Sequence, residues 1–128
     1  MTEKKLPRLI AGSAARCAAR DVMVEIISGW AAEGRPDTYG RLSALMKESG
    51  YSVPPRGTLM GALLKEACLV EAGRGVPVML TAIMVNGHSK RPSGQFEVFA
   101  KEAPFRRGDQ PNWTWEAERD RVFAHYRQ

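Results

Sequence analysis

The chain has 128 residues and a mass of 14.2 kDa, and 44% of its residues are hydrophobic and 26% charged, which is typical of one globular domain and argues against a disordered protein. Nineteen Lys and Arg residues against fourteen Asp and Glu residues give a net charge of +5, which favours anionic partners. No apolar stretch approaches the ~20 residues needed to cross a bilayer, and the N-terminus has no apolar run of signal-peptide length, so we expect a cytoplasmic protein without membrane contact.

The first helix is predicted to follow a polar segment. Residues 1–13 read as a flexible lead-in, because Pro and Gly interrupt them and no apolar period is sustained. Residues 14–33 have the period of a helix, with Val22, Ile26 and Trp30 four positions apart. A single domain over residues 14–128 is therefore expected.

Two more helices follow in the first half of the chain. Asp37 or Thr38 is a favourable N-cap for a helix of about three turns that ends at Gly50. A longer helix is predicted from Arg56 to about Ala72, with an apolar residue at every third or fourth position.

A change of period then predicts two strands. Residues 76–85 are rich in β-branched and bulky apolar side chains, and a strong turn dipeptide, Asn86-Gly87, follows them. In residues 95–100, Phe96 and Val98 alternate with Glu97 and Phe99, as in a returning strand. The polar, basic residues 86–94 would form the projecting tip of this β-hairpin.

The chain ends in a polar stretch and a final helix. Residues 104–111 contain Arg106 and Arg107, and residues 113–127 place Trp115 and Tyr126 on one side of a helix. We expect this helix to close the hydrophobic core.

The order of these elements predicts an α+β winged helix-turn-helix fold, with a three-helix core, a β-hairpin wing and an added C-terminal helix. In such a fold the third helix is positioned for the major groove of DNA, and a basic wing can reach phosphates. Contacts with double-stranded DNA are predicted for Arg41, Arg56, Thr58, Lys65, Lys90, Arg91, Arg106 and Arg107.

The chain also resembles a known family. The sequence Thr-Tyr-Gly-Arg-Leu-Ser-Ala-Leu at residues 38–45 resembles the segment that opens the helix-turn-helix of DNA alkyltransferase and alkyltransferase-like domains. Gly-Ala-Leu at residues 61–63 is similar to part of that family's recognition helix, and residues 76–86 resemble the strand that follows it. The resemblance covers about half of the chain and implies a DNA-binding scaffold.

The chemistry of that family is missing from the sequence. Where the family has Pro-Cys-His-Arg, residues 80–85 contain neither Cys nor His, so the alkyl-accepting nucleophile is absent. The family's nucleotide-flipping Arg corresponds to Gly57, and Arg56 lies one position away. The resemblance therefore implies DNA binding without alkyl transfer.

No other catalytic or metal-binding pattern is found in the sequence. Cys17 and Cys68 lack the paired spacing of a zinc site and are expected to be buried. Glu116 and Asp120 lie four residues apart on the last helix but have no third ligand nearby. No catalytic residue, metal or cofactor is therefore predicted, and His88 and His125 are expected to be surface residues.

Two main functions remain open from the sequence, and an enzyme whose site is assembled only in three dimensions is a third alternative. The first is a non-catalytic protein that binds double-stranded DNA, as a transcription regulator or an accessory factor. The second is a protein-binding winged-helix module, such as a phage or mobile-element protein that blocks a host complex, because the fold does not fix the function. A homodimer is a further alternative, with Trp113 and either Trp30 or Phe105 at its seam.

Overall fold

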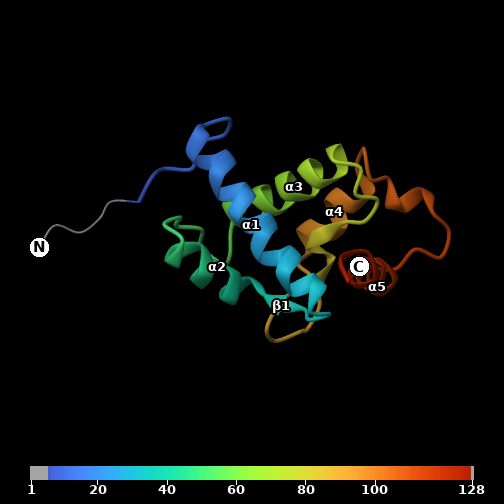
Figure 1. The fold of residues 1–128 in the computed structure, drawn as a ribbon. Coiled ribbons are helices and arrows are strands. Elements are labelled where there is room, and N and C mark those ends of the chain that lie inside the picture. The colour runs from blue at the N-terminus through green and yellow to red at the C-terminus, as the bar shows by residue number, and fades with distance from the viewer. Residues whose placement is uncertain (1–5, 128) are drawn as a thin grey trace, which may run out of the picture.

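Five α-helices and two short strands make up the part of the chain that the structure, a computed structural model, describes: residues 6–127 (Figure 1). The elements, in chain order, are α1 (Ala14–Ala32), β1 (Asp37–Thr38), α2 (Tyr39–Glu48), α3 (Thr58–Gly73), η1 (Leu80–Ile83), β2 (Met84–Val85), α4 (Gly94–Lys101), η2 (Arg107–Asp109) and α5 (Trp115–Tyr126), where η denotes a short 3-10 helix. The fold is therefore α+β and rich in helices.

Helices α1, α2, α3 and α5 confirm the predicted helices to within about two residues at each end. Side-chain caps begin three of them: the hydroxyls of Ser13, Thr38 and Thr114 each accept a hydrogen bond from the backbone N–H three residues on. Of the predicted lead-in, residues 1–5 lie outside the described part. Leu9 packs against the core, and its carbonyl accepts a hydrogen bond from Arg16.

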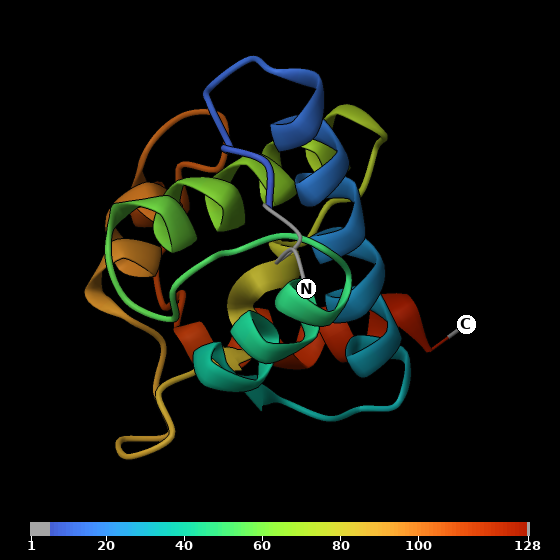
Figure 2. The same ribbon diagram turned by 90° about the vertical axis from the view of Figure 1, so that its left-hand side faces the viewer.

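The centre of the core is the apolar run that leads into β2. Every residue from Val78 to Val85 is buried. The 3-10 helix η1 within this run contacts α1, α3 and α5, which surround it (Figure 2). A segment that is covered on all sides shows no polar face, and its periodicity therefore does not distinguish a strand from another buried conformation.

The predicted β-hairpin is wrong, because its returning strand is the helix α4. Helix α4 buries Phe96, Phe99 and Ala100, which follow the spacing of a helix, whereas Val98 is 61% exposed. Strand β2 instead pairs in parallel with β1, with Asp37 opposite Met84. No antiparallel hairpin is formed within residues 6–127.

The segment between β2 and α4 is a projecting loop, residues 86–93 (Figure 2). Its base is closed by the backbone N–H of Asn86, which donates to the carbonyl of Arg91 at 2.8 Å, and by the Asn86 side chain, which donates to the same oxygen at 3.2 Å. This loop occupies the place in the chain order where a wing was predicted.

The aromatic residues considered for a dimer seam lie in or against the core. Trp30 and Phe105 are buried, and Trp113 is half-buried. They do not form an exposed aromatic patch. Across residues 6–127, no helix combines the length and apolar character required to span a membrane.

Candidate nucleic-acid interface

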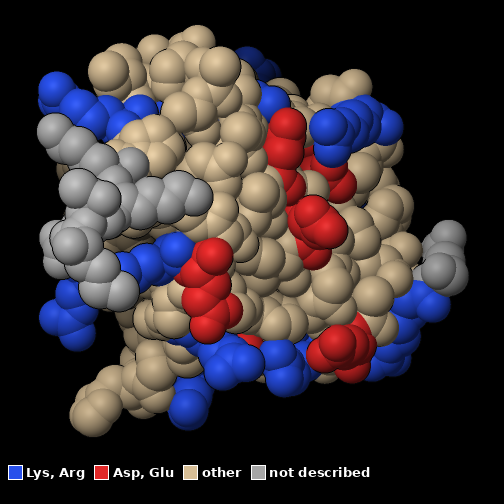
Figure 3. Space-filling view, turned by 60° about the vertical axis from the view of Figure 1, so that its left-hand side comes forward, with Lys and Arg blue, Asp and Glu red and all other residues tan. Residues whose placement is uncertain are grey.

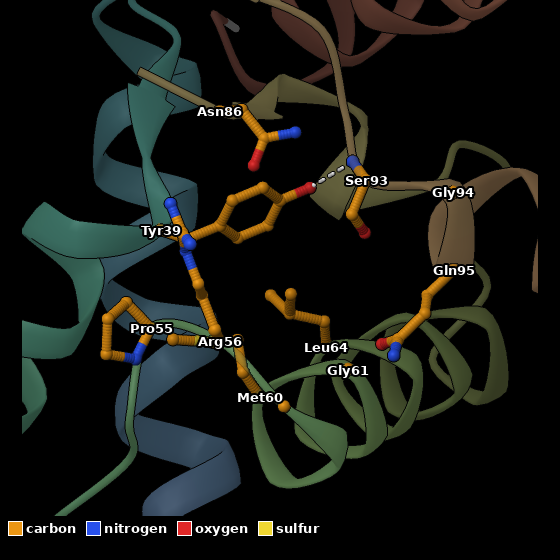
Figure 4. Close-up of a pocket in the computed structure, with 11 residues that line it drawn as sticks. Tyr39, Pro55, Arg56, Met60, Gly61, Leu64, Asn86, Ser93, Gly94 and Gln95 are labelled. Atoms are coloured by element: carbon orange, nitrogen blue, oxygen red, sulfur yellow. Dashed lines mark hydrogen bonds between the residues drawn. The ribbon is translucent and has the colours of Figure 1, made fainter. Parts of the chain in front are cut away.

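A cavity of about 360 Å³ lies where the first turns of α2, α3 and α4 meet (Figure 4). Tyr39, Met60 and Leu64 provide apolar walls. Asn86 and Ser93, at the two ends of the projecting loop, add polar groups at its edge. A flat aromatic or heteroaromatic ligand would find both apolar contacts and hydrogen-bonding partners in such a site.

The phenol of Tyr39 joins three elements around this cavity. Tyr39 follows β1 directly, and its hydroxyl lies 3.4 Å from the carbonyl of Met84 in β2, to which it donates. The same oxygen accepts a hydrogen bond from the backbone N–H of Ser93 at 2.9 Å (Figure 4). The ring is 7% exposed, so these hydrogen bonds are shielded from water and fix the end of the projecting loop.

Arg56 also lines this cavity, just before α3 begins. Its side chain is exposed. The next residue, Gly57, has φ +107°, a conformation that residues with a Cβ rarely adopt. The turn at Gly57 therefore helps to place the guanidinium of Arg56 at the mouth of the cavity.

The outer face of α3 forms one side of a second, more apolar groove. Thr58 and Lys65 line this groove of about 520 Å³, with Val98 of α4 on the opposite side. The ammonium of Lys65 pairs with the carboxylate of Glu102 at 2.8 Å across it. The charge of Lys65 is thus partly neutralised, whereas the Thr58 side chain is exposed at the start of the helix.

Lys90 and Arg91 lie together in the projecting loop, and both are exposed. Lys90 has φ +60° and closes the loop through its backbone N–H, which donates to the carbonyl of Asn86. The guanidinium carbon of Arg91 lies 5.9 Å from the ring centre of Trp115, within cation–π range. The guanidinium of Arg91 therefore lies beside an aromatic ring, whereas Lys90 is exposed within the loop.

The two remaining exposed arginines of the predicted set lie elsewhere on the surface. Arg41 is on the first turn of α2, and its Nε lies 4.0 Å from a carboxylate oxygen of Asp37. Arg106 is exposed in the connection between α4 and η2. Neither lines the cavity.

Within residues 6–127, four cations of the predicted set have no ion-pair partner within 4.0 Å. They are Arg56, Lys90, Arg91 and Arg106. No neighbouring carboxylate among the described residues offsets the charge of these side chains, so they are the ones best able to attract an anion.

Arg107 does not face an external anion, contrary to the sequence prediction. It is only 9% exposed, and its guanidinium donates to the carboxylate of Glu118 and to the carbonyls of Phe105 and Pro77. All of its nitrogen atoms are engaged inside the protein. Arg107 is therefore a structural residue and is left out of the interface described below.

Glu118 is the partner that explains the burial of Arg107. It is fully buried, and it accepts hydrogen bonds from Arg107, from the indole of Trp113 at 2.8 Å and from the backbone N–H of Met79 at 2.9 Å. Burial by itself raises the pKa of Glu118, but these hydrogen bonds outweigh burial and lower the pKa below its ordinary value. The ionised carboxylate thus connects α5 to the core segment and to η2.

Basic and acidic side chains are mixed on the face that Figure 3 shows. Lys and Arg gather along its lower edge, with Asp and Glu between them. On this face, an anionic partner would therefore meet separate basic contacts and not a continuous positive patch.

The remaining titratable residues include no candidate metal centre in the described part of the chain. No group of three or more His, Cys, Asp and Glu suited to a metal ion occurs there. Cys68 is buried as expected, and burial raises the pKa of its thiol to about 11. Cys17 is partly exposed, contrary to the expectation that both cysteines are buried.

Sequence reasoning missed Tyr39, Asn86 and Ser93 as residues of the site. The Thr-Tyr-Gly segment drew attention to Tyr39 only as part of a motif, and Asn86 was recognised only as a turn residue. The cavity brings them together because the parallel pairing of β1 and β2 places the start of α2 beside the projecting loop.

Comparison with known proteins found no family, no curated protein and no solved structure that matches the chain.

Proposed function

We propose that the protein binds double-stranded DNA without catalysis, as a regulator or an accessory factor, through the surface around the cavity. The observation that carries this proposal is that Arg56 and both ends of the loop bearing Lys90 line one cavity. Arg56 is an exposed cation of the cavity lining, and Lys90 is an exposed cation of the loop whose end residues, Asn86 and Ser93, belong to the same lining. Cations that are free of carboxylate partners release counterions when they contact DNA phosphates, which favours binding.

The proposed docking resembles that of helix-turn-helix proteins. Helix α3 offers Arg56 and Thr58 at its N-terminal end, where backbone N–H groups also favour phosphate oxygens. The loop of residues 86–93 takes the role predicted for a wing. In this arrangement Arg41 and Arg106 would extend the contact with phosphates.

The cavity itself suits an unpaired base. Its volume of about 360 Å³ exceeds that of a single base, Tyr39 and Leu64 offer apolar contact, and the amides of Asn86 and Gln95 offer hydrogen bonds. We infer that a base displaced from the duplex binds here and is released unchanged.

One observation favours the second candidate, a protein-binding module. The groove between α3 and α4 is mostly apolar, and Val98 at its edge is 61% exposed. Grooves of this kind accept an amphipathic helix of a partner protein. The Lys65–Glu102 pair across the groove gives no further indication of a partner, so DNA binding is the stronger proposal.

The test is fluorescence anisotropy of a labelled 20-base-pair duplex, titrated with protein at several NaCl concentrations. The double variant Arg56→Ala, Lys90→Ala should bind all sequences more weakly. Its salt slope should be lower by about two, since each lost phosphate contact lowers the slope by roughly 0.9.

Arg74→Ala is the matched control. Arg74 lies at the C-terminal end of α3, about 24 Å from the start of the helix by the rise of 1.5 Å per residue. The variant removes one surface charge at this distant end. It should bind DNA with a nearly unchanged salt slope. If the double variant and the control behave alike, this surface does not contact DNA. If wild-type protein does not bind the duplex at the lowest salt concentration, DNA binding is wrong and the protein-binding function is favoured.

A further inference from the structure

Two arginines from different elements converge on one indole ring. The guanidinium carbon of Arg91, in the projecting loop, lies 5.9 Å from the ring centre of Trp115, and that of Arg119, in α5, lies 5.2 Å from it. Trp115 is only 8% exposed, and its indole N–H donates to the carbonyl of Ala82 at 2.6 Å. The ring is therefore held in place, and two cations lie beside it.

This arrangement gathers positive charge. Arg91 has no carboxylate within 4.0 Å among the described residues. Arg119 shares its Nε with the exposed carboxylate of Asp120 at 3.1 Å, which leaves its two terminal nitrogens for another acceptor. Two like charges beside one ring repel each other, and an anion that contacts either of them would relieve that repulsion.

The chemistry of these two side chains suits a phosphate group in particular. Guanidinium groups are planar and donate two parallel hydrogen bonds to phosphate oxygens. Stacking on the ring restricts both side chains before a ligand arrives, so less conformational entropy is lost on binding. The N-terminal end of α5, which begins at Trp115, adds a favourable dipole, although Glu116 and Asp120 on the exposed face of the helix oppose it in part.

We infer that Arg91 and Arg119, stacked on Trp115, form a contact for a backbone phosphate of nucleic acid. The inference rests on the proposed DNA binding and adds Arg119, which charge patterning along the sequence did not single out. It extends the DNA contact from the cavity and the projecting loop to the first turns of α5.

The test measures binding of the labelled duplex across NaCl concentrations by wild-type protein, Arg119→Ala and Arg119→Lys. Arg121→Ala is the control, because Arg121 is an exposed arginine of the same helix whose guanidinium lies 3.6 Å from the Glu118 carboxylate and not over Trp115. Arg119→Ala should bind several-fold more weakly, with a salt slope lower by roughly 0.9. Arg119→Lys keeps the charge, so it should keep the slope but lose affinity through its lost planar donors. Thermal unfolding of each variant shows whether the fold is intact.

The outcomes separate this inference from the function on which it rests. If wild-type protein binds the duplex and Arg119→Ala matches it in affinity and slope, the phosphate contact is wrong and DNA binding stands. If Arg119→Ala and Arg121→Ala weaken binding equally, the effect is one of general charge and the specific site is again wrong. If wild-type protein does not bind the duplex at any salt concentration, the proposed function fails and this phosphate contact fails with it.

Discussion

The hydroxyl of Tyr39 accepts a hydrogen bond from the backbone N–H of Ser93 at 2.9 Å, and this bond joins the start of α2 to the end of the projecting loop. The two residues are 54 positions apart in the sequence. A buried side chain of the core therefore holds one end of the loop that carries Lys90 and Arg91, beside the cavity.

Replacing Tyr39 by Phe should free this end of the loop. The ring would still fill its place, but the N–H of Ser93 would lose its acceptor, which costs about 1–3 kcal/mol when the group stays shielded from water. We expect a lower free energy of unfolding in urea and faster hydrogen exchange at Ser93. Tyr51→Phe is the control, since Tyr51 is half-buried and its hydroxyl makes no hydrogen bond to the described residues. Equal stability of the two variants would show that the Tyr39 hydroxyl does not hold the loop.

Stability should fall in acid through Glu118. Its pKa in the folded protein lies below the ordinary value of 4.5, so its contribution is present above pH 4.5 and is lost as the pH falls through the folded pKa. Glu118→Gln leaves the buried Arg107 without a counter-charge and should cost about 3–5 kcal/mol at pH 7.

The measurement is thermal unfolding of wild type and Glu118→Gln from pH 7 down to pH 3. The difference between them should shrink below pH 4.5, while the exposed Glu116→Gln follows wild type throughout. A constant difference over this range would mean that Glu118 is not the group that titrates.

Two glycines should respond to alanine in opposite directions. Gly57 has φ +107° and ψ −176°, so Gly57→Ala imposes backbone strain of roughly 1–3 kcal/mol and should lower the midpoint of urea unfolding. Gly29 lies within α1 with open space at its Cβ position. Gly29→Ala should therefore raise the free energy of unfolding by about 0.5–1 kcal/mol and raise the urea midpoint with it. A stabilised Gly57→Ala would contradict the turn that places Arg56.

The two cysteines should differ in reactivity. A thiol with a pKa of about 11 is ionised to only about one part in a thousand at pH 8, and Cys68 is also fully buried. Native protein treated with iodoacetamide at pH 8 should therefore be modified at Cys17 and not at Cys68, as read by peptide mass mapping, and both should react in urea. Rapid modification of native Cys68 would contradict its position beside Thr81.

Local signals were sufficient to predict α1, α2, α3 and α5, but not α4 or the pairing of the strands. Ser13 and Thr38 cap helices with their own side chains, so the information lies within a few residues. In residues 95–100, both a strand and a helix would bury Phe96, and the packing of Phe99 against Phe105 decides for the helix. That contact depends on tertiary structure, which a short window of sequence does not contain.

The same distinction applies to the site. Charge patterning identified Arg56 and Lys90, which the structure leaves exposed, because their neighbours in sequence are small or polar. It did not separate Arg106 from Arg107, since the burial of Arg107 depends on Glu118, eleven positions away. The cavity itself could not be predicted, because the pairing of β1 with β2 assembles it from residues that are far apart in the chain.

The most direct test of the proposed function compares two labelled duplexes with wild-type protein across NaCl concentrations: one fully paired and one that is identical except for a single unpaired base. The proposal predicts dissociation constants in the micromolar range or tighter at low salt, a steep loss of affinity with salt, and tighter binding of the duplex whose unpaired base can enter the cavity. Absence of binding to both duplexes at the lowest salt would contradict DNA binding. Equal affinity for the two would leave DNA binding in place and contradict the role of the cavity beside Tyr39.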